Sequence, residues 1–396
     1  MSPTPLPGTP RLLRAINDRA ALELLLARGP LTRSQIGELT GLSKVTASQT
    51  LTRLEERGLV AVTGQQAGVR GPSAAVYAVV PSTAIVAGLD VAPEAVTTGV
   101  ADVTGQVLAE VTVDPNGVGN PVQLVRNAVA AACRAAQIEA AQLRAVVIGT
   151  GGMVDPRTGD VRLSVNLPDW HEGVLGALRG DLRRPVTIEN DVNLAAMAEH
   201  AQGAARGVDD FVLVWMGVGL GLAAILGGRL HRGARGAAGE IGYLPVPGVP
   251  LPEDLTHPAA GGFRSLADGR EVRALAERYG FAAPANGDAV AAAVRAAAAG
   301  QSSGEEFLAD LARRVAVGVA AISVTLDPGL VVLGGEVGQA GGTALADRVS
   351  VEVSRICPVK PDVVPTAVPD APVLRGALLA AVAQARTALL ASVADG

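Results

Sequence analysis

The stretch that most constrains the fold is residues 31–60, where two short helical segments flank a glycine and a strand-like segment follows. Apolar side chains recur there at helical spacing, at Leu31, Ile36, Leu39, Leu42, Val45, Leu51, Leu54 and Leu59. Gly41 stands where a turn between two helices needs a positive φ. Thr32 and Ser43 precede the two segments, and each can accept a hydrogen bond from a free backbone N–H at a helix start. The pattern predicts two capped helices joined by a tight turn.

The second predicted helix carries a polar outer face and leads into a hairpin. Its outward side chains are Ser43, Lys44, Thr46, Ser48, Gln49 and Arg53. Gly58 ends the helix, residues 59–63 form a strand, and a polar turn with Gln65, Gln66, Arg70, Gly71 and Pro72 precedes a strand over 75–80. These features predict a winged helix-turn-helix DNA-binding domain over residues 1–80. The alternative is a helical hairpin that serves packing alone, but cap, turn, polar face and wing all agree on the winged helix.

The distribution of charge predicts which part of the chain meets nucleic acid. Residues 1–80 hold nine Lys and Arg against five Asp and Glu, a net charge of +4, whereas the rest of the chain carries −9. Only the N-terminal part is therefore expected to touch DNA. An aromatic content of 2% leaves little material for stacking on single-stranded bases, which favours duplex DNA. We assign phosphate contacts to Lys44, Arg53 and Arg70, and base readout to Thr46, Ser48 and Gln49.

Length and composition set the remaining bounds. A chain of 396 residues predicts two or three domains. No apolar run approaches the roughly 20 uncharged residues that span a bilayer, and the N-terminus lacks a cationic, apolar signal, so a soluble cytoplasmic protein is expected. Cys133 and Cys357 are too few for a disulfide framework or a cysteine-rich metal site, and we expect them to be core thiols.

Beyond residue 80 the sequence alternates strands with helices in two similar rounds. The first round is a meander of strands over 85–91, 97–101 and 107–112, then a helix over 122–136 and a strand over 143–148. The second has strands over 211–216, 222–226 and 229–232, helices around 271–278, 287–299 and 304–327, and a strand over 330–333. The repetition predicts an internal duplication, in which two α/β lobes bracket a ligand cleft.

Several motifs in this part resemble those of one family. They are GTGGMVDPRTGDV (149–161), SVNLPDW (164–170), IENDVNLAAMAE (188–199), GGRLHRGARGAAGEIGY (227–243) and VVLGGEV (331–337). On these segments, residues 81–392 resemble the ROK family of repressors, uncharacterised reading frames and sugar kinases. The resemblance implies a duplicated, actin-like and ribonuclease-H-like α/β fold. We expect one lobe over residues 81–192, completed by a C-terminal helix over 373–392, and a second lobe over 193–372.

The resemblance also implies a sugar site. Asp191 matches the general base that takes a proton from a sugar hydroxyl in the family's kinases, and Asn190 offers a donor and an acceptor to the same sugar. Glu240 matches a carboxylate that accepts sugar hydroxyls, while Asn166 and the backbone of residues 150–152, with Gly151 and Gly152, line the opposite wall. The alternative is structural: Asp191 caps the helix that starts at Val192, and Glu240 pairs with a cation such as Arg235.

Two departures from the family pattern predict a protein without cofactor. The kinases' D-x-G-G-T phosphate loop is replaced by Asp90 to Glu94, where Ala92 and Pro93 stand in place of glycines, and a second loop, usually G-T-G, reads Gly217-Val218-Gly219. We therefore expect no ATP-dependent kinase activity.

The family's zinc site is missing as well. Its cysteine cluster is absent from residues 244–270, where His257 is alone and Tyr243 stands in place of the zinc-binding histidine, so no metal is expected. Arg264 aligns with a Glu that contacts sugar in the family, which reverses the charge there.

The combined interpretation is a sugar-responsive transcriptional regulator, most simply a repressor and not an enzyme. A homodimer, or a tetramer, would place two recognition helices on a palindromic duplex operator about 34–36 Å apart. Two alternatives stay open: a ligand-independent DNA-binding protein whose ROK body only dimerises, and an active sugar kinase with a DNA-binding head. With two anchors lost, the ligand is a different or smaller polyol, or the pocket is vestigial.

Overall fold

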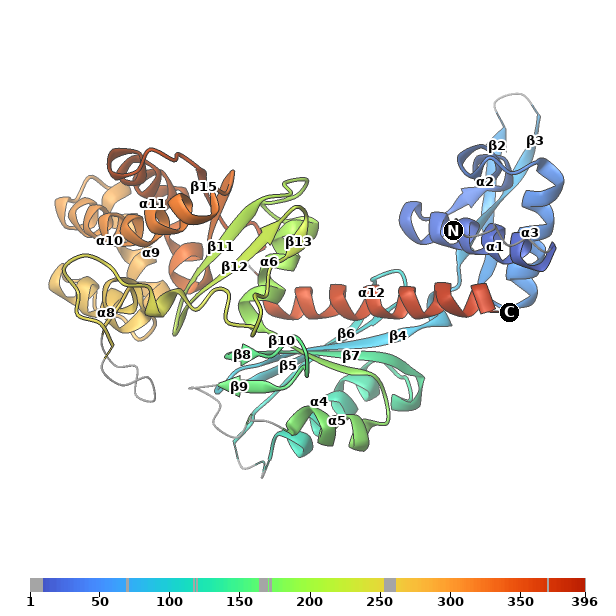
Figure 1. The fold of residues 1–396 in the computed structure, drawn as a ribbon, viewed down its shortest axis with the longest axis horizontal. Coiled ribbons are helices and arrows are strands. Elements are labelled where there is room, and N and C mark those ends of the chain that lie inside the picture. Colours follow the sequence, from blue (N-terminus) through green and yellow to red (C-terminus); the bar gives the residue numbers. More distant parts are fainter. Residues whose placement is uncertain are drawn as a thin grey trace, which may run out of the picture.

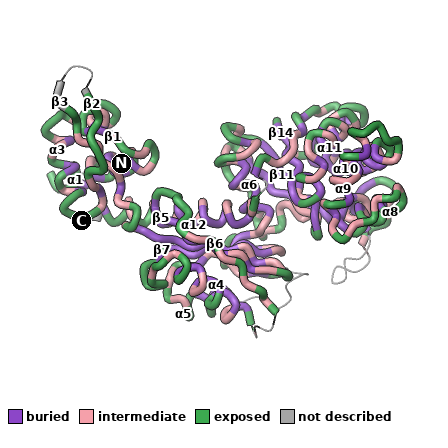
Figure 2. Tube along the Cα trace, turned by 180° about the vertical axis from the view of Figure 1, so that it is seen from behind, coloured by how far each residue is buried: buried purple, intermediate pink, exposed green. Residues whose placement is uncertain are grey.

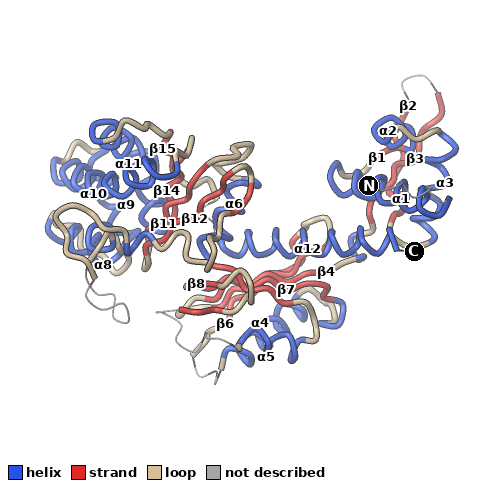
Figure 3. The backbone as a smooth tube through the Cα atoms, in the orientation of Figure 1, coloured by secondary structure: helices blue, strands red, loops and turns tan. Residues whose placement is uncertain are grey.

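A computed structural model describes residues 10–68, 71–116, 118, 120–163, 170, 173–252, 261–368 and 370–395. The chain forms three parts: an N-terminal head, a first lobe in the middle and a second lobe at the far end (Figure 1). One long C-terminal helix runs along the first lobe toward the head, as the tube in Figure 3 also shows.

The head is a winged helix. Its elements are α1 (Pro10–Arg28), β1 (Leu31–Thr32), α2 (Arg33–Thr40), α3 (Lys44–Glu56), β2 (Val60–Gly68) and β3 (Gly71–Val79). Thr32 caps α2 in a capping box with Gln35, and Gly41 ends α2 with a φ of 72°. The Ser43 hydroxyl accepts a hydrogen bond from the Thr46 N–H at 3.2 Å and caps α3. Both predicted helix starts and the glycine turn are confirmed.

The head differs from its prediction in three respects. Helix α1 was not expected, yet its Leu22 and Leu25 are buried in the head's core beside Ile36 and Leu54. The wing strands run further than predicted, because β2 continues to Gly68 and β3 begins at Gly71. Leu39 and Val45, which we expected among the apolar contacts, are 55% and 67% exposed. Each short helix buries one face only, and these two side chains lie on the other.

The first lobe is a five-stranded sheet in the order β10-β7-β4-β5-β6. Its strands are β4 (Ile85–Val91), β5 (Val96–Asp102), β6 (Val107–Val113), β7 (Leu143–Thr150) and β10 (Val186–Asn190), and its helices are α4 (Pro121–Ala135) and α5 (Val174–Leu182). The short elements are η1 (Pro81–Thr83), η2 (Ala140–Gln142), β8 (Met153–Val154) and β9 (Val161–Leu163). Strand β4 alternates its side chains, so Ile85, Ala87 and Leu89 face the α4 and α5 side while Val86 faces the C-terminal helix.

The second lobe repeats this plan with the sheet order β13-β12-β11-β14-β15. Its strands are β11 (Phe211–Met216), β12 (Leu220–Leu226), β13 (Arg229–Leu230), β14 (Leu330–Gly334) and β15 (Asp362–Pro365). Its helices are η3 (Ile241–Tyr243), α7 (Arg264–Ala267), α8 (Gly269–Arg278), α9 (Asn286–Ala298), α10 (Ser302–Leu326) and α11 (Gly335–Ile356). In both sheets an antiparallel meander is extended by two parallel strands, so the predicted duplication is confirmed.

Two helices connect the parts. Helix α6 (Asp191–Gln202) leads from the first sheet to the second, and α12 (Pro372–Asp395) returns to pack on α6, β4, β7 and finally α1. The approach is close: a Cβ on Gly376 would overlap the Leu194 carbonyl oxygen of α6, and one on Gly88 would lie 2.8 Å from the Leu378 nitrogen. One apolar core therefore runs from the head along α12 into the second lobe. Figure 2 shows that all three parts contain buried segments.

Helix α12 is also the one helix among the described residues that has the length and apolar composition to cross a membrane, with a mean hydropathy of 1.6. It carries Arg375 and Arg386, and its buried side packs on the first sheet and the head. These contacts are those of a core helix.

Candidate DNA interface and interlobe cleft

The start of α3 is built from two mutually bonded hydroxyls. Ser43 Oγ lies 2.9 Å from Thr46 Oγ1, in addition to accepting the Thr46 N–H. Both side chains had been predicted to contact DNA. Their hydroxyls are already engaged in holding the helix start, which leaves them reduced capacity for hydrogen bonds to bases or phosphates.

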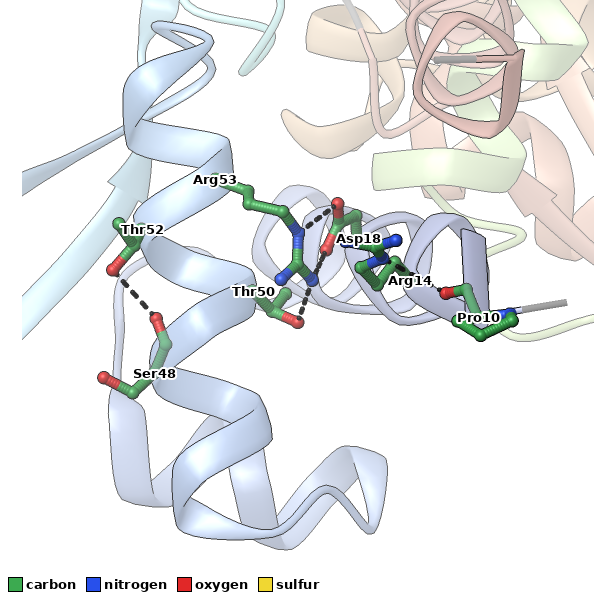
Figure 4. Close-up of polar contacts among 7 residues, drawn as sticks. All are labelled: Pro10, Arg14, Asp18, Ser48, Thr50, Thr52 and Arg53. Carbon is green, nitrogen blue, oxygen red and sulfur yellow. Dashed lines mark hydrogen bonds and ion pairs between the residues drawn. The ribbon is translucent and has the colours of Figure 1, made fainter. Parts of the chain in front are cut away.

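Arg53 is held in place by partners within the head. Its Nε donates to Asp18 Oδ2 at 3.0 Å, and Nη2 donates to the other Asp18 oxygen and to Thr50 Oγ1, at 3.0 Å for the latter (Figure 4). Asp18 is 5% exposed, and its hydrogen bond raises the pKa of Arg53. The guanidinium thus ties α3 to α1 and neutralises a buried carboxylate. This pairing gives Arg53 a positioning role and balances its charge within the head, and its assignment to phosphate stays a prediction.

The exposed part of α3 keeps other polar groups available. Lys44 and Gln49 are exposed, and their side chains make no hydrogen bond or ion pair with the described residues. Ser48 Oγ accepts a 3.4 Å hydrogen bond from Arg33 Nη1. Arg33 is exposed at the start of α2 and was missed, although its position directly after the Thr32 cap could have revealed it. Arg70 lies outside the described residues.

The carboxyl ends of three parallel strands, β4, β7 and β10, meet at one edge of the first sheet. In register, Asp90 of β4 lies beside Gly149 of β7, and Asn190 of β10 lies beside Thr150. This edge is where α/β folds present ligand-binding groups. Gly151 follows directly, and a Cβ there would lie 3.6 Å from Asp191 Oδ2. Four of the predicted sugar-site residues, Gly151, Gly152, Asn190 and Asp191, therefore lie together.

Both polar atoms of the Asn190 side chain form hydrogen bonds with the backbone, which was not expected. Its Oδ1 accepts the Asn193 N–H at 3.1 Å and caps α6, while its Nδ2 donates to the Gly152 carbonyl at 3.1 Å. Asn190 is therefore the N-cap of α6. Asp191 Oδ1 also accepts the Val192 N–H at 2.8 Å, as the structural alternative for Asp191 expected. Neighbouring Glu189 is buried and accepts from Asn193 Nδ2 and from Arg232 Nε, at 2.7 Å for the latter.

Three carboxyl groups share the cleft. Burial, and secondarily the charge of Asp191, raises the pKa of Asp90 to about 7. Burial also raises the pKa of Asp191. The pKa of Glu240 is raised by burial and then by Asp191, against the opposing charge of Arg264. Glu240 lies directly before η3 of the second lobe, so carboxylates from both lobes influence one another across the cleft.

Arg264 and Tyr243 form part of the second-lobe wall. The Arg264 guanidinium carbon lies 4.2 Å from the Tyr243 ring centroid, and its Nε donates to the Gly242 carbonyl at 3.4 Å. Within the part of the chain that the structure describes, Glu240 forms no ion pair with Arg235, and the cation that acts on its charge is Arg264. A cation thus faces the cleft at the position where the family resemblance implied an acid. Asn166 and His257 lie outside the described residues.

The two loops that correspond to phosphate loops are tight turns. Ala92 donates its N–H to the Ala95 carbonyl at 3.0 Å, which closes the turn that carries Pro93 and Glu94. Gly217 donates to the Gly219 carbonyl at 3.0 Å, and Val218 between them is 65% exposed.

Helix α11 starts close to this second turn. A Cβ on Gly217 would lie 3.8 Å from the Glu336 nitrogen in the first turn of α11. The Glu336 carboxylate complements the helix dipole that would otherwise attract a phosphate. Among the described residues, no group of three or more His, Cys, Asp or Glu side chains is arranged to hold a metal ion.

Glu199 connects the two chain crossings between the lobes. It lies near the end of α6, is 1% exposed, and accepts from the N–H groups of Ala204 at 2.7 Å and Val368 at 3.1 Å. Ala367 N–H and the Thr366 hydroxyl also donate to it. One buried carboxylate thus binds the end of α6 to the segment between β15 and α12. Glu199 therefore lies where both chain crossings between the lobes meet.

A winged-helix head on a duplicated, two-lobed body defines the class of protein. The chain belongs to the ROK family, because a family model described as ROK family matches residues 86–384. A second model, described as MarR family, matches residues 16–70, from α1 to the wing.

Relatives of this chain include regulators and enzymes. NagC of Escherichia coli K12, described as a DNA-binding transcriptional dual regulator, is 25% identical over 340 residues, which are 84% of this chain and 83% of that protein. The bifunctional enzyme NanE/NanK of Brucella melitensis is 37% identical over 176 residues, 44% of this chain, and the match spans only 31% of the enzyme.

A solved structure has the same overall fold. The crystal structure of a ROK family transcriptional regulator, described as a homolog of the E. coli MLC protein, matches with a TM-score of 0.73 at 19% identity, over 97% of this chain and 100% of that chain.

Proposed function

We propose that this chain is a DNA-binding transcriptional repressor whose operator affinity responds to a sugar bound between the lobes. The observation that carries the proposal is the capped recognition helix α3, exposed with Lys44 and Gln49 on a basic head. The similarity to NagC, a DNA-binding transcriptional regulator, and to the ROK family transcriptional regulator of known structure supports the same interpretation. Double-stranded operator DNA is the proposed partner, read by a homodimer or tetramer in the cytoplasm. We retain the division at residues 80, 192 and 372.

The proposed effector is a small carbohydrate. Asp191 and Glu240, with Asn166, Asn190, Gly151 and Gly152, are the proposed ligand residues. A pKa of about 7 lets the neighbouring Asp90 both donate to and accept from a sugar hydroxyl near neutral pH. Burial also raises the pKa values of Asp191 and Glu240. Arg264 favours a ligand with an additional acceptor group on the second-lobe side.

We further propose that the chain transfers no phosphoryl group and needs neither ATP nor a metal. The turns at 92–95 and 217–219 use backbone N–H groups internally, Pro93 has none, and Glu336 places a negative charge at the helix start nearby. Phosphoryl transfer depends on positioning and charge neutralisation, and these turns offer little of either.

The structure suggests how cleft and head are coupled. A sugar that prefers one lobe angle would shift the two crossings bound by Glu199, and α12 begins just beyond the Val368 that this carboxylate holds. At its other end α12 packs on α1, and the Ser392 carbonyl accepts from Arg57 Nη2 at 3.1 Å. Movement at the two crossings bound by Glu199 would thereby reach Arg57, the residue that directly follows α3.

The test has two stages. Duplexes bound by the full-length protein are selected from a random pool, and the footprint of the selected operator is determined. Gln49→Ala should weaken operator preference more than affinity for random DNA; equal losses on both would contradict its assignment to base readout.

The second stage concerns the ligand. Thermal unfolding is measured against monosaccharides, disaccharides, their phosphates and ATP, since a ligand at 100 times its Kd adds about 2.7 kcal/mol. A shift with one sugar that also changes operator affinity supports the proposal. Operator binding without any sugar response would favour the ligand-independent alternative, and sugar-dependent ATP turnover abolished by Asp191→Ala would favour the kinase.

A further inference from the structure

One apolar side chain lies in the middle of the polar face of α3. Val45 is 67% exposed and stands at the second position of the helix, after the Ser43 cap and Lys44. One helical turn further on, Gln49 is exposed as well. Residues four apart lie on the same helix face with Cβ atoms about 5–6 Å apart, so Val45 and Gln49 form one surface.

Most neighbouring polar groups on this end of α3 are already bonded within the head. Ser43 and Thr46 bond each other, Ser48 accepts from Arg33, and Arg53 is held by Asp18. Lys44, a flexible cation, suits a phosphate. The side chains left to discriminate base pairs at this end are therefore Val45 and Gln49.

The distribution of charge along α3 determines which end enters the groove. Glu55 and Glu56 are exposed at its C-terminal end, where they would repel phosphates. Its N-terminal end carries Lys44 and the positive end of the helix dipole. The first two turns, which hold Val45 and Gln49, are therefore the part that lies deepest in the major groove.

We propose that Val45 is a specificity-determining residue that packs against the C5 methyl group of a thymine in each operator half-site. The major-groove edge of thymine is distinguished by this methyl group, and apolar side chains are what recognise it. Gln49 would contact a base within about two base pairs of that thymine, given a rise of about 3.4 Å per base pair. The inference rests on the proposed DNA-binding function.

The alternative is that Val45 has no function in recognition, since single apolar side chains on a protein surface are common. Val351 of α11 provides the comparison, because it is also 67% exposed but belongs to the second lobe. Replacing either valine by alanine removes two exposed methyl groups and leaves the packing of the protein nearly unchanged. Only Val45→Ala should alter how the protein distinguishes thymine from uracil.

The experiment uses the full-length protein and its selected operator. Each thymine of one half-site, with its symmetry mate, is replaced by deoxyuridine, which removes the C5 methyl alone. Affinities of wild type, Val45→Ala and Val351→Ala are measured by fluorescence anisotropy, and thermal unfolding confirms that all three are folded. Wild type and Val351→Ala should lose about fourfold in affinity at one thymine, and Val45→Ala should lose nothing further there.

The outcomes separate this inference from the function on which it rests. If the operator is bound specifically but every deoxyuridine substitution affects wild type and Val45→Ala by the same factor, the role of Val45 is wrong while the DNA-binding function stands. If no duplex is bound specifically, both are wrong.

Discussion

The polar side chains of the proposed DNA-binding face are exposed, whereas those between the two lobes are buried or half-buried. In the head, Lys44 and Gln49 are exposed on a short capped helix, so a substitution there should change what the protein binds and leave its stability alone. In the cleft and hinge, Asp90, Asp191 and Glu199 are buried or half-buried, and each is coupled to its surroundings. A functional site on a rigid surface can be altered one residue at a time. A site of buried carboxyl groups between two lobes cannot be altered in this way, because its ligand residues also contribute to the stability of the fold.

The largest expected effect is at the α6–α12 crossing. Gly376→Ala places a Cβ against the Leu194 carbonyl oxygen, which α12 can avoid only by moving away from α6. We expect a loss of about 3 kcal/mol or more in the free energy of unfolding, measured by denaturant titration. The control is Gly180→Ala in α5, where a Cβ meets nothing within 4 Å; it should be neutral or slightly stabilising. Similar behaviour of the two variants would mean that the close crossing is not required.

The next effect concerns the hinge. Glu199→Gln keeps the shape of the side chain but turns an acceptor of several N–H groups into a group with its own donors, which would face the Ala204 and Val368 N–H groups. A loss of about 2 kcal/mol is expected, because buried N–H groups lose their partner. Glu277→Gln, on the exposed face of α8, is the matched control. An unchanged melting curve for Glu199→Gln would contradict the claim that Glu199 holds the two chain crossings together.

Within the head, Arg53 and Lys44 should behave differently although both are cations of α3. Arg53→Ala leaves Asp18 buried without its ion-pair partner, and we expect a loss of about 2 kcal/mol in stability. The measurement is thermal unfolding of the full chain. If Arg53→Ala melts like wild type and only DNA binding falls, the stabilising role of Arg53 is contradicted and its predicted phosphate contact is supported.

Lys44→Ala, by contrast, should leave the melting temperature unchanged. It should weaken binding to operator and random duplexes alike and reduce the slope of log K against log salt by about 1, because one phosphate contact is lost. Anisotropy titrations at several salt concentrations measure this. A loss confined to the operator would instead place Lys44 on a base.

The smallest expected effect is the pH dependence contributed by Asp90. Its folded pKa of about 7 lies above its ordinary value, so the folded state binds the proton more tightly. The stability that this confers is complete below the ordinary pKa of 3.8, and it is lost as the pH rises from there through 7. Asp90→Asn should therefore gain on wild type by at least about 1 kcal/mol in the free energy of unfolding as the pH rises from 5 to 8. Glu94→Gln in the adjacent exposed turn should follow wild type at both values; equal curves for all three would contradict the burial of Asp90.

Local signals in the sequence were enough for the main elements. The caps at Thr32 and Ser43, the left-handed Gly41 and the two meanders were predictable because each depends on residues close in sequence. The cluster of Gly151, Asn190 and Asp191 at the carboxyl ends of the strands followed from the alternation of strands and helices together with the family resemblance, whereas Asp90 was not predicted to join it.

Long-range pairings were not predictable in this way. Nothing near Arg53 indicates that Asp18, on a helix 35 residues earlier, will take its charge. The same holds for Glu199, whose partners at 366–368 come from the far end of the second lobe. The exposure of Val45 was missed because spacing alone does not say which of two apolar stripes on a short helix faces the core.

The most direct test of the central claim is the affinity of the full-length protein for its selected operator, titrated with each sugar of the panel and with ATP. We predict that one sugar changes the operator Kd by between about 5-fold and 150-fold, the usual range of coupling between two sites, while ATP changes nothing. An operator Kd unaffected by every sugar, in a protein whose melting temperature no sugar shifts, would contradict a sugar-responsive repressor.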